Sequence, residues 1–450
     1  MLQTLYLKNV GPAPEVAATF APRLNLITGD NGLGKSFLLD IAWWTMTRRW
    51  PRELNPALTS GDMARPARGA AASIEFAVTG KSKAIAYRSS FSVQDQAWKG
   101  KAGRPLNPGL VLYAMADGGF AVWDPARNYW RKKGNIDVQD RMPAYVFGPR
   151  EVWDGLSDPN RGVLCEGLVA DWASWQKEAG PTYALLCSVL DKLSPEEGEA
   201  LSPGPFARLS VDDARRVPTL KMPYGQAVPV VHASAGMKRM IALAYLLVWS
   251  WQEHVEASRF LNQKTASQVV FLIDEIEAHL HPRWQRSVVA ALLEVVGALA
   301  PKAKVQLIVA THSPLVMASV EPVFDARQDA WFDLDLVRGA ANRPATVSFE
   351  QRPFVRRGDA SRWLMSEAFD LKSAGSLAAE RVLAEAALAM SDASFDRKAA
   401  RAMHAKLTAV LGDVDPFWIR WRHVGEAKGW WDAKAGVGRR VRKSAARVPP

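Results

Sequence analysis

The sequence predicts an α/β fold in which a parallel β-sheet carries a phosphate-binding loop. An antiparallel β subdomain, a compact helical lid and a helical C-terminal region are predicted to accompany this sheet. The apolar run 24–27 leads into a glycine-rich loop, and a helical pattern follows that loop directly. Two further apolar runs, at 269–273 and 305–310, are typical of strands buried on both faces of a parallel sheet. The periodicity between 360 and 412 is that of helices.

The glycine-rich loop fits the pattern G-x-x-x-x-G-K-[ST], which binds phosphates through inward-pointing backbone N–H groups. In such a loop Lys35 supplies a positive charge to the β- and γ-phosphate oxygens, and Ser36 supplies a hydroxyl for Mg²⁺. The strand before the loop and the helix after it favour this interpretation over a glycine-rich turn with an incidental lysine. The residues expected to bind a nucleoside triphosphate are Gly29, Asp30, Asn31, Gly32, Leu33, Gly34, Lys35 and Ser36.

The length and composition are those of a globular protein. The chain has 450 residues, 48% of them hydrophobic and 23% charged, which allows two or three structural units. Its two cysteines form no C-x-x-C pair, which is typical of a reducing compartment. The longest largely apolar run, 240–251, is too short to span a bilayer. We therefore expect a cytoplasmic protein with no membrane partner.

The net charge of +11 is concentrated near the C-terminus. The segment 434–450 contains no acid and carries Lys434, Arg439, Arg440, Arg442, Lys443 and Arg447. A basic tail of this kind can follow a nucleic-acid backbone with little sequence preference. The alternative is a solvated tail that has no partner.

Strands are expected at 2–10, 15–20 and 24–28, and a hairpin is expected around Asp117, Gly118 and Gly119. Helical periodicity is found at 153–193, 374–390 and 396–411. The predicted units are the nucleotide-binding core at 1–70 and 206–345, the antiparallel β subdomain at 71–150, the helical lid at 151–205, the C-terminal helical region at 346–430 and the basic tail at 431–450.

Two predicted buried strands end in residues that suit phosphate chemistry. Asp274 and Glu275 end the first strand, and His312 follows the second. Because open α/β sheets bind ligands at the carboxyl ends of their strands, Asp274 is expected to hold Mg²⁺ and Glu275 to polarise the attacking water. His312 is expected to hydrogen-bond to the γ-phosphate. The alternatives are solvated acids that end a strand and a histidine that is an ordinary core or surface residue.

The segment 233–240 opens a long apolar helix with Ser234, Ala235 and Gly236, and then places Lys238 and Arg239 in its first turn. Cations at this end oppose the helix dipole, which favours anions there. A phosphate docked on the helix N-terminus would explain them. An ordinary N-cap serine, with both cations directed to water, explains the pattern equally well.

These four segments, in this order, resemble the nucleotide-binding domain of the ABC-type ATPases. The opening segment 5–9 and the segment 274–282, with its D-E-x-E-x-x-L-H-P pattern, resemble the soluble branch that contains RecF, SMC and OLD proteins. The resemblance implies an ABC-type ATPase head in which Ser234, Ala235 and Gly236 form the signature motif and contact ATP held by another protomer. It also implies that His312 is the switch histidine.

The resemblance leaves three points open. The signature usually reads L-S-G-G-Q, whereas this chain has Ala-Ser-Ala-Gly-Met, so the strength of ATP-driven closure is in question. The Q-loop glutamine has three candidates, namely Gln94, Gln96 and Gln139. A group formed by Glu277, His279 and His281 fits either a second metal site or a dimer-contact loop.

A signature that acts in trans implies a homodimer or higher homo-oligomer whose closed form is favoured by ATP and released by hydrolysis. The segment between Ser36 and Ser234 lacks the long coiled coil of an SMC arm. The Asp333-Leu334-Asp335 segment is the only candidate for a TOPRIM nuclease motif, and intrinsic nuclease activity is not expected. The remaining resemblance is to ATPase subunits of bacterial anti-phage systems, such as Septu or retron-associated ATPases, that control a separate nuclease-like effector. A RecF-like DNA repair or recombination clamp and a regulatory scaffold with slow turnover are the alternatives.

Overall fold

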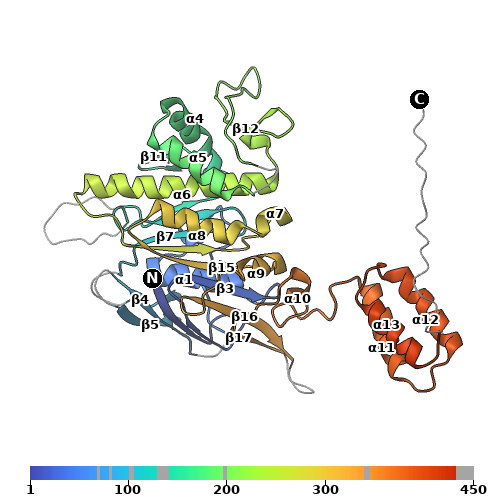
Figure 1. The fold of residues 1–450 in the computed structure, drawn as a ribbon. Helices are drawn as coiled ribbons and strands as arrows, with labels where there is room; N and C mark the ends of the chain where they lie inside the picture. Colours follow the sequence, from blue (N-terminus) through green and yellow to red (C-terminus); the bar gives the residue numbers. More distant parts are fainter. Residues whose placement is uncertain are drawn as a thin grey trace, which may run out of the picture. The chain divides into compact units, whose positions relative to one another are not determined.

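The computed structural model describes residues 1–67, 71–80, 84–100, 106–128, 141–195, 200–338 and 345–431. The chain divides into two compact units (Figure 1). The larger unit comprises residues 1–363 with 367–369, and the smaller one comprises residues 364–366 and the chain from Asp370 onward. Among the described helices, none combines the length and the apolar character needed to cross a membrane.

The centre of the larger unit is an eight-stranded sheet with the order β17-β16-β3-β15-β14-β7-β8-β9. The five strands from β16 to β7 are parallel, and the remaining strands pair antiparallel at the two edges. The bounds of these strands are Leu24–Gly29 (β3), Leu110–Ala114 (β7), Phe120–Trp123 (β8), Tyr145–Phe147 (β9), Gln268–Ile273 (β14), Lys304–Ala310 (β15), Asp329–Val337 (β16) and Thr346–Arg352 (β17). The predicted buried strands at 24–28, 269–273 and 305–310 are confirmed as β3, β14 and β15.

The continuous apolar runs arise because this sheet is covered on both faces. In β14, Phe271 and Ile273 face one hydrophobic core, while Val270 and Leu272 face another. The first core is completed by helices on one face and the second by α1 and an antiparallel sheet on the other (Figure 1). The helices concerned are α1 (Lys35–Thr47), α6 (Ala235–Phe260), α8 (Val288–Leu299) and α9 (Pro314–Val320).

The antiparallel sheet has the strand order β2-β1-β4-β5-β6. Its strands are Leu2–Lys8 (β1), Glu15–Thr19 (β2), Ser73–Thr79 (β4), Ala84–Ser92 (β5) and Ala97–Trp98 (β6). We expected all of 71–150 to form one antiparallel subdomain, and the structure divides this segment instead. Strand β7 pairs in parallel with β14, and every one of its residues is buried, so β7 to β9 extend the central sheet. The hairpin of β7 and β8 is confirmed.

The predicted helical lid contains α3 (Glu151–Asp154), α4 (Leu168–Glu178) and α5 (Pro181–Leu193), together with the hairpin of β10 (Leu156–Asp158) and β11 (Gly162–Cys165). A second short hairpin, of β12 (Thr219–Lys221) and β13 (Ala227–Pro229), precedes α6. Tyr245 on α6 joins the lid to the core, since its hydroxyl donates to Asp171 at 2.6 Å and lies 3.1 Å from the Cys165 sulfur. Other short helices of the larger unit are α2 (Pro51–Leu54), η1 (Val230–His232) and α7 (Pro282–Gln285).

The smaller unit is a bundle of α11 (Leu377–Ser391), α12 (Arg397–Val410) and α13 (Phe417–Ala427) around buried Trp418, Trp421 and Trp430. The helical region was expected to start at 346, but β17 occupies 346–352, and the short α10 (Ala360–Leu364) follows.

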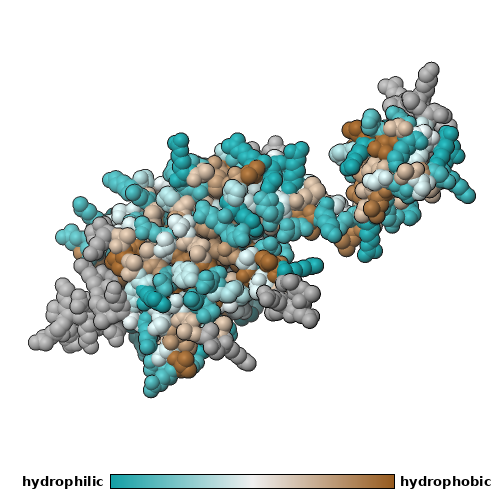
Figure 2. All heavy atoms as spheres, turned by 90° about the horizontal axis from the view of Figure 1, so that it is seen from below, coloured by the Kyte–Doolittle hydropathy of each residue, from teal (hydrophilic) through white to brown (hydrophobic). Residues whose placement is uncertain are grey.

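Hydrophobic side chains reach the surface of this bundle on the face that Figure 2 shows. Its most exposed large apolar residues are Leu377, Leu388, Val414 and Ile419. Of the predicted basic tail, residues 432–450 lie outside the described part of the chain.

Candidate nucleotide site

The glycine-rich loop connects β3 to α1, as predicted. Gly29 has a φ of 134°, and a Cβ there would lie 2.3 Å from the backbone oxygen of Leu334 on the neighbouring β16. Gly34, with a φ of 102°, caps α1, and a Cβ there would lie 2.8 Å from Pro12. The first turn of α1 contains no acid, and its N-cap makes no side-chain hydrogen bond. The backbone N–H groups at this helix start therefore suit an anion.

Lys35 is held inside the loop. Its ammonium donates to the carbonyl oxygens of Gly29 at 2.6 Å and Asp30 at 2.9 Å, and the residue is buried. Burial lowers the pKa of Lys35, while the nearby Asp274 and Glu275 act in the opposite direction. A buried lysine whose ammonium bonds to the loop itself favours the phosphate-loop interpretation over a glycine-rich turn with an incidental lysine.

Asp274 lies directly after β14 and is 1% exposed. Its Oδ1 is buried and has no hydrogen-bond partner among the described residues. Burial raises the pKa of Asp274 to about 6, although a hydrogen bond with the Ser36 side chain lowers it. A hydroxyl and a carboxylate with a free oxygen are the ligand types that Mg²⁺ takes, so Ser36 and Asp274 fit that ion.

Glu275 and His312 meet where β14 and β15 end. His312 Nε2 lies 3.9 Å from Glu275 Oε1, and both side chains are partly exposed. Burial, with the Lys35 charge, lowers the pKa of His312, so the imidazole is neutral at pH 7. The φ of Glu275 is 45°, in the left-handed region that residues with a side chain seldom adopt.

Glu277 connects the same two strand ends. Its carboxylate accepts hydrogen bonds from the backbone N–H of His312 and from the Thr311 hydroxyl, the latter at 2.7 Å. This engagement favours a structural role for Glu277 over the second metal site considered from the sequence. Among the described residues, no group of three or more His, Cys, Asp or Glu side chains is placed to hold a metal.

The predicted signature segment forms the start of α6. Ser234 is an exposed N-cap whose Oγ accepts from Met237 N at 3.3 Å, and Ala235 is also exposed. Gly236 is buried, and a Cβ there would lie 2.6 Å from the backbone oxygen of His279. The serine therefore caps its own helix and still presents its side chain to solvent.

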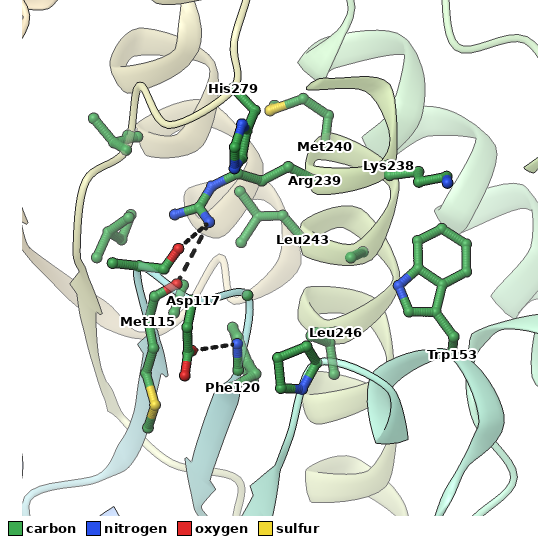
Figure 3. A pocket seen from close by; sticks show the side chains of 18 of the residues that line it. Met115, Asp117, Phe120, Trp153, Lys238, Arg239, Met240, Leu243, Leu246 and His279 are labelled. Carbon is green, nitrogen blue, oxygen red and sulfur yellow. Dashed lines mark hydrogen bonds between the residues drawn. The ribbon is translucent and has the colours of Figure 1, made fainter. Parts of the chain in front are cut away.

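Arg239 does not point to water, so this part of the N-cap alternative is wrong. Its guanidinium donates to the backbone oxygens of Met115 and Ala116, which follow β7 (Figure 3). It also donates to the backbone oxygens of Asp274 and Glu275, which follow β14. It borders a cavity of about 180 Å³ between α6 and the β7–β8 turn. The walls of this cavity include Met115, Phe120, Trp153, Leu243 and Leu246.

No candidate Q-loop glutamine is found at this edge of the sheet in the described chain. Gln94 and Gln96 lie between β5 and β6 in the other sheet, where Gln96 accepts from Arg65 at 2.8 Å. Gln139 is outside the described residues. The segment that follows β7, next to Asp274, consists of Met115, Ala116 and Asp117.

Sequence reasoning missed the contacts of Arg239 and Glu277. Both side chains bind backbone from strands that are distant in the chain, so no local pattern reveals their partners. The only available signal for Arg239 was its unfavourable position in the first turn of a helix.

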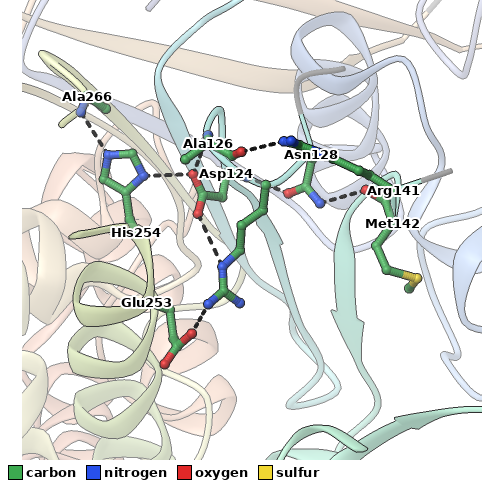
Figure 4. A network of polar contacts seen from close by, with 9 residues as sticks. Asp124, Ala126, Asn128, Arg141, Met142, Glu253, His254 and Ala266 are labelled. Carbon is green, nitrogen blue, oxygen red and sulfur yellow. Dashed lines mark hydrogen bonds and ion pairs between the residues drawn. The ribbon is translucent and has the colours of Figure 1, made fainter. Parts of the chain in front are cut away.

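A buried polar network lies near the opposite, amino end of β14 (Figure 4). His254 on α6 accepts from Ala266 N at 2.8 Å through Nε2, so its Nδ1 donates to Asp124 at 2.7 Å. Arg127 forms ion pairs with Glu253 and with Asp124. This network connects α6 to the end of β8 and is separate from the nucleotide site.

Comparisons with known proteins support the nucleotide-binding interpretation. The family described as "AAA domain, putative AbiEii toxin, Type IV TA system" matches residues 24–318. The "Retron Vc95 probable ATPase" of Vibrio cholerae serotype O1 biovar El Tor is 32% identical over 96 residues. The matched segment is 21% of this chain and only 17% of that protein.

Solved SMC heads are also similar to the chain. For the SMC head domain from Thermotoga maritima the TM-score is 0.35 at 13% identity, over 77% of this chain and 98% of that one. For the SmcHead bound to the C-winged helix domain of ScpA the TM-score is 0.38 at 16% identity, over 78% and 97%. The family match covers more than half of the chain, and the chain therefore belongs to the AAA-domain family that includes the putative AbiEii toxins.

Proposed function

We propose that this AAA-family protein is a Mg²⁺-dependent cytoplasmic ATPase that works as a dimeric switch. One observation carries the proposal. The phosphate loop, the Ser36–Asp274 pair and the Glu275–His312 pair all lie at the carboxyl ends of adjacent parallel strands. That edge is where open α/β sheets bind their ligands.

Each residue has a role in this proposal. Residues 29–36 hold the phosphates through backbone N–H groups and the Lys35 ammonium. Ser36 and Asp274 hold Mg²⁺, which would neutralise phosphate charge. Glu275 accepts a hydrogen bond from the attacking water and orients it, while neutral His312 donates to the γ-phosphate.

The exposure of Ser234 and Ala235 supports a dimer. Both residues lie at the start of α6 with backbone N–H groups available nearby, an arrangement that suits a phosphate carried by another copy. ATP would then join two copies, and hydrolysis would release them. The missing first glycine of the signature, replaced by Ala235, is expected to weaken this closure.

The family and the retron relative support a defence role. The family description names a toxin and a toxin–antitoxin system, and the relative is named as a retron ATPase. We therefore propose that the switch controls a separate, nuclease-like effector in a retron-type or abortive-infection system rather than a Septu system specifically. We also propose that the basic residues after 433 contact nucleic acid.

The E275Q variant tests the proposal. It should bind ATP and lose at least about 100-fold of the hydrolysis rate, because the group that orients water is removed. Gel filtration with light scattering should show an ATP-dependent dimer for E275Q. The control is E256Q, which changes an exposed glutamate on α6 whose partner is Arg259. Hydrolysis by E275Q at the wild-type rate would remove Glu275 from the mechanism.

A further inference from the structure

We infer that Arg239 is a positioning residue that couples the start of α6 to the catalytic glutamate Glu275. The inference rests on the proposed function. It adds a physical link between the contact of Ser234 with the ATP of another copy and hydrolysis at Glu275. Ser234, proposed to meet the ATP of another copy, and Arg239 lie on the first turns of one helix.

The contacts of Arg239 span two strand ends. Its Nη1 lies 3.2 Å from the oxygen of Ala116, after β7, and 3.5 Å from that of Met115. Its Nη2 lies 2.9 Å from the oxygen of Asp274 and 3.2 Å from that of Glu275, after β14. A planar guanidinium can hydrogen-bond to the backbone after both strands at once, because its two terminal nitrogens are fixed relative to each other.

The Glu275 backbone requires such support. Its φ of 45° is unfavourable for a residue with a side chain and persists only where the surroundings enforce it. Arg239 bonds to the carbonyl of this residue and to the one before it. The orientation of the Glu275 carboxylate therefore depends on where α6 places Arg239.

Two features of α6 suit it to transmit a displacement. Gly236 packs directly on the His279 carbonyl, so the start of the helix also contacts the loop that follows Glu275. Beside Arg239, the cavity of about 180 Å³ leaves Leu243 and Leu246 incompletely packed against the β7–β8 turn (Figure 3). A phosphate that draws Ser234 outward would move Arg239, and with it the Glu275 carbonyl.

The experiment measures ATP binding and steady-state ATP hydrolysis for R239A and R239K in the full-length chain. R239A should lower kcat by about 10- to 100-fold and leave KM and ATP affinity within about twofold of wild type. R239K should not restore kcat, because a lysine has a single ammonium nitrogen in place of the two guanidinium nitrogens that bond to the backbone after different strands. The control R259A removes an exposed arginine from the far end of α6 and should match wild type.

A double variant separates positioning from a structural role. In an E275Q background R239A should cause no further loss, because its effect passes through Glu275. Equal losses in both backgrounds, full rescue by R239K, or wild-type kcat in R239A would each overturn the inference. Thermal unfolding of every variant identifies any loss of hydrolysis that is due to misfolding. If R239A misfolds, the kcat of R239K tests the positioning role instead. Wild-type hydrolysis in E275Q would instead refute the proposed function.

Discussion

At the residue scale, the candidate site gathers groups in unfavourable states. Lys35 is a buried cation, and Glu275 has a positive φ. One buried oxygen of Asp274 has no hydrogen-bond partner in the described part of the chain. Each of these states has a cost that ordinary positions avoid. Their concentration at one edge of the sheet is typical of a functional site.

Asp40 is a further buried acid, one turn after the phosphate loop. It is 6% exposed, and the Tyr113 hydroxyl donates to its Oδ1 at 2.9 Å. Burial raises the pKa of Asp40 to about 7 from 3.8. Between these two pH values the folded chain holds a proton that the unfolded chain has lost.

The sign of the pH dependence follows from this difference in bound protons. As pH rises from about 4 to 7, Asp40 lowers the free energy of unfolding by on the order of 4 kcal/mol. The D40N variant should remove that loss of stability. Its melting temperature should therefore exceed that of wild type by more at pH 8 than at pH 5.5. The control D212N alters an exposed carboxylate and should show no such gain. An equal pH profile for D40N and wild type would contradict a raised pKa at Asp40.

The motif residues of the site could be predicted because their chemistry is local. Turn-forming glycines, Lys35 and Ser36 are adjacent in the sequence, and acids at strand ends follow directly from apolar runs. The carbonyl contacts of Arg239 and the link from Glu277 to Thr311 could not be predicted. They depend on which strands become neighbours, and the sequence leaves that order open.

At the element scale, strands with continuous apolar runs or a regular alternation, such as β1 and β2, were predictable, whereas a buried strand that contains acids was not. Strand β16 was missed because it contains Asp329, Asp333 and Asp335, and the last two were considered as a nuclease motif instead. Asp329 pairs with Arg23, and Asp333 accepts from the Thr28 hydroxyl at 2.6 Å. These distant partners allow acids inside a buried strand, but no local pattern indicates them.

The close contact between α6 and the loop after β14 gives a prediction for Gly236, with Gly297 on α8 as the comparison. G236A should lower the free energy of unfolding by about 1–3 kcal/mol, because its Cβ would clash with the His279 backbone. G297A on α8 has nothing within 4 Å of the added Cβ and should stabilise by up to about 1 kcal/mol through helix propensity. Urea unfolding measures both, and a stabilised G236A would show that the close approach is not a constraint.

At the scale of the whole molecule, the chain combines a nucleotide-binding unit with a separate helical bundle. The larger unit has its own two cores around the central sheet, and the bundle has a third core built on tryptophans. The sequence indicated the helices of the bundle but set its start too early, because β17 carries few apolar residues. Leu377 and Leu388 are exposed on the surface of the bundle.

The proposed dimeric switch requires that ATP is held between two copies, by the phosphate loop of one and the start of α6 of the other. A structure of the chain with a non-hydrolysable ATP analogue and Mg²⁺ tests it most directly. We expect Ser234 Oγ of one copy to lie within about 3 Å of the γ-phosphate that Lys35 of the other copy contacts. Ser234 remote from bound nucleotide in every pairing of copies would contradict it.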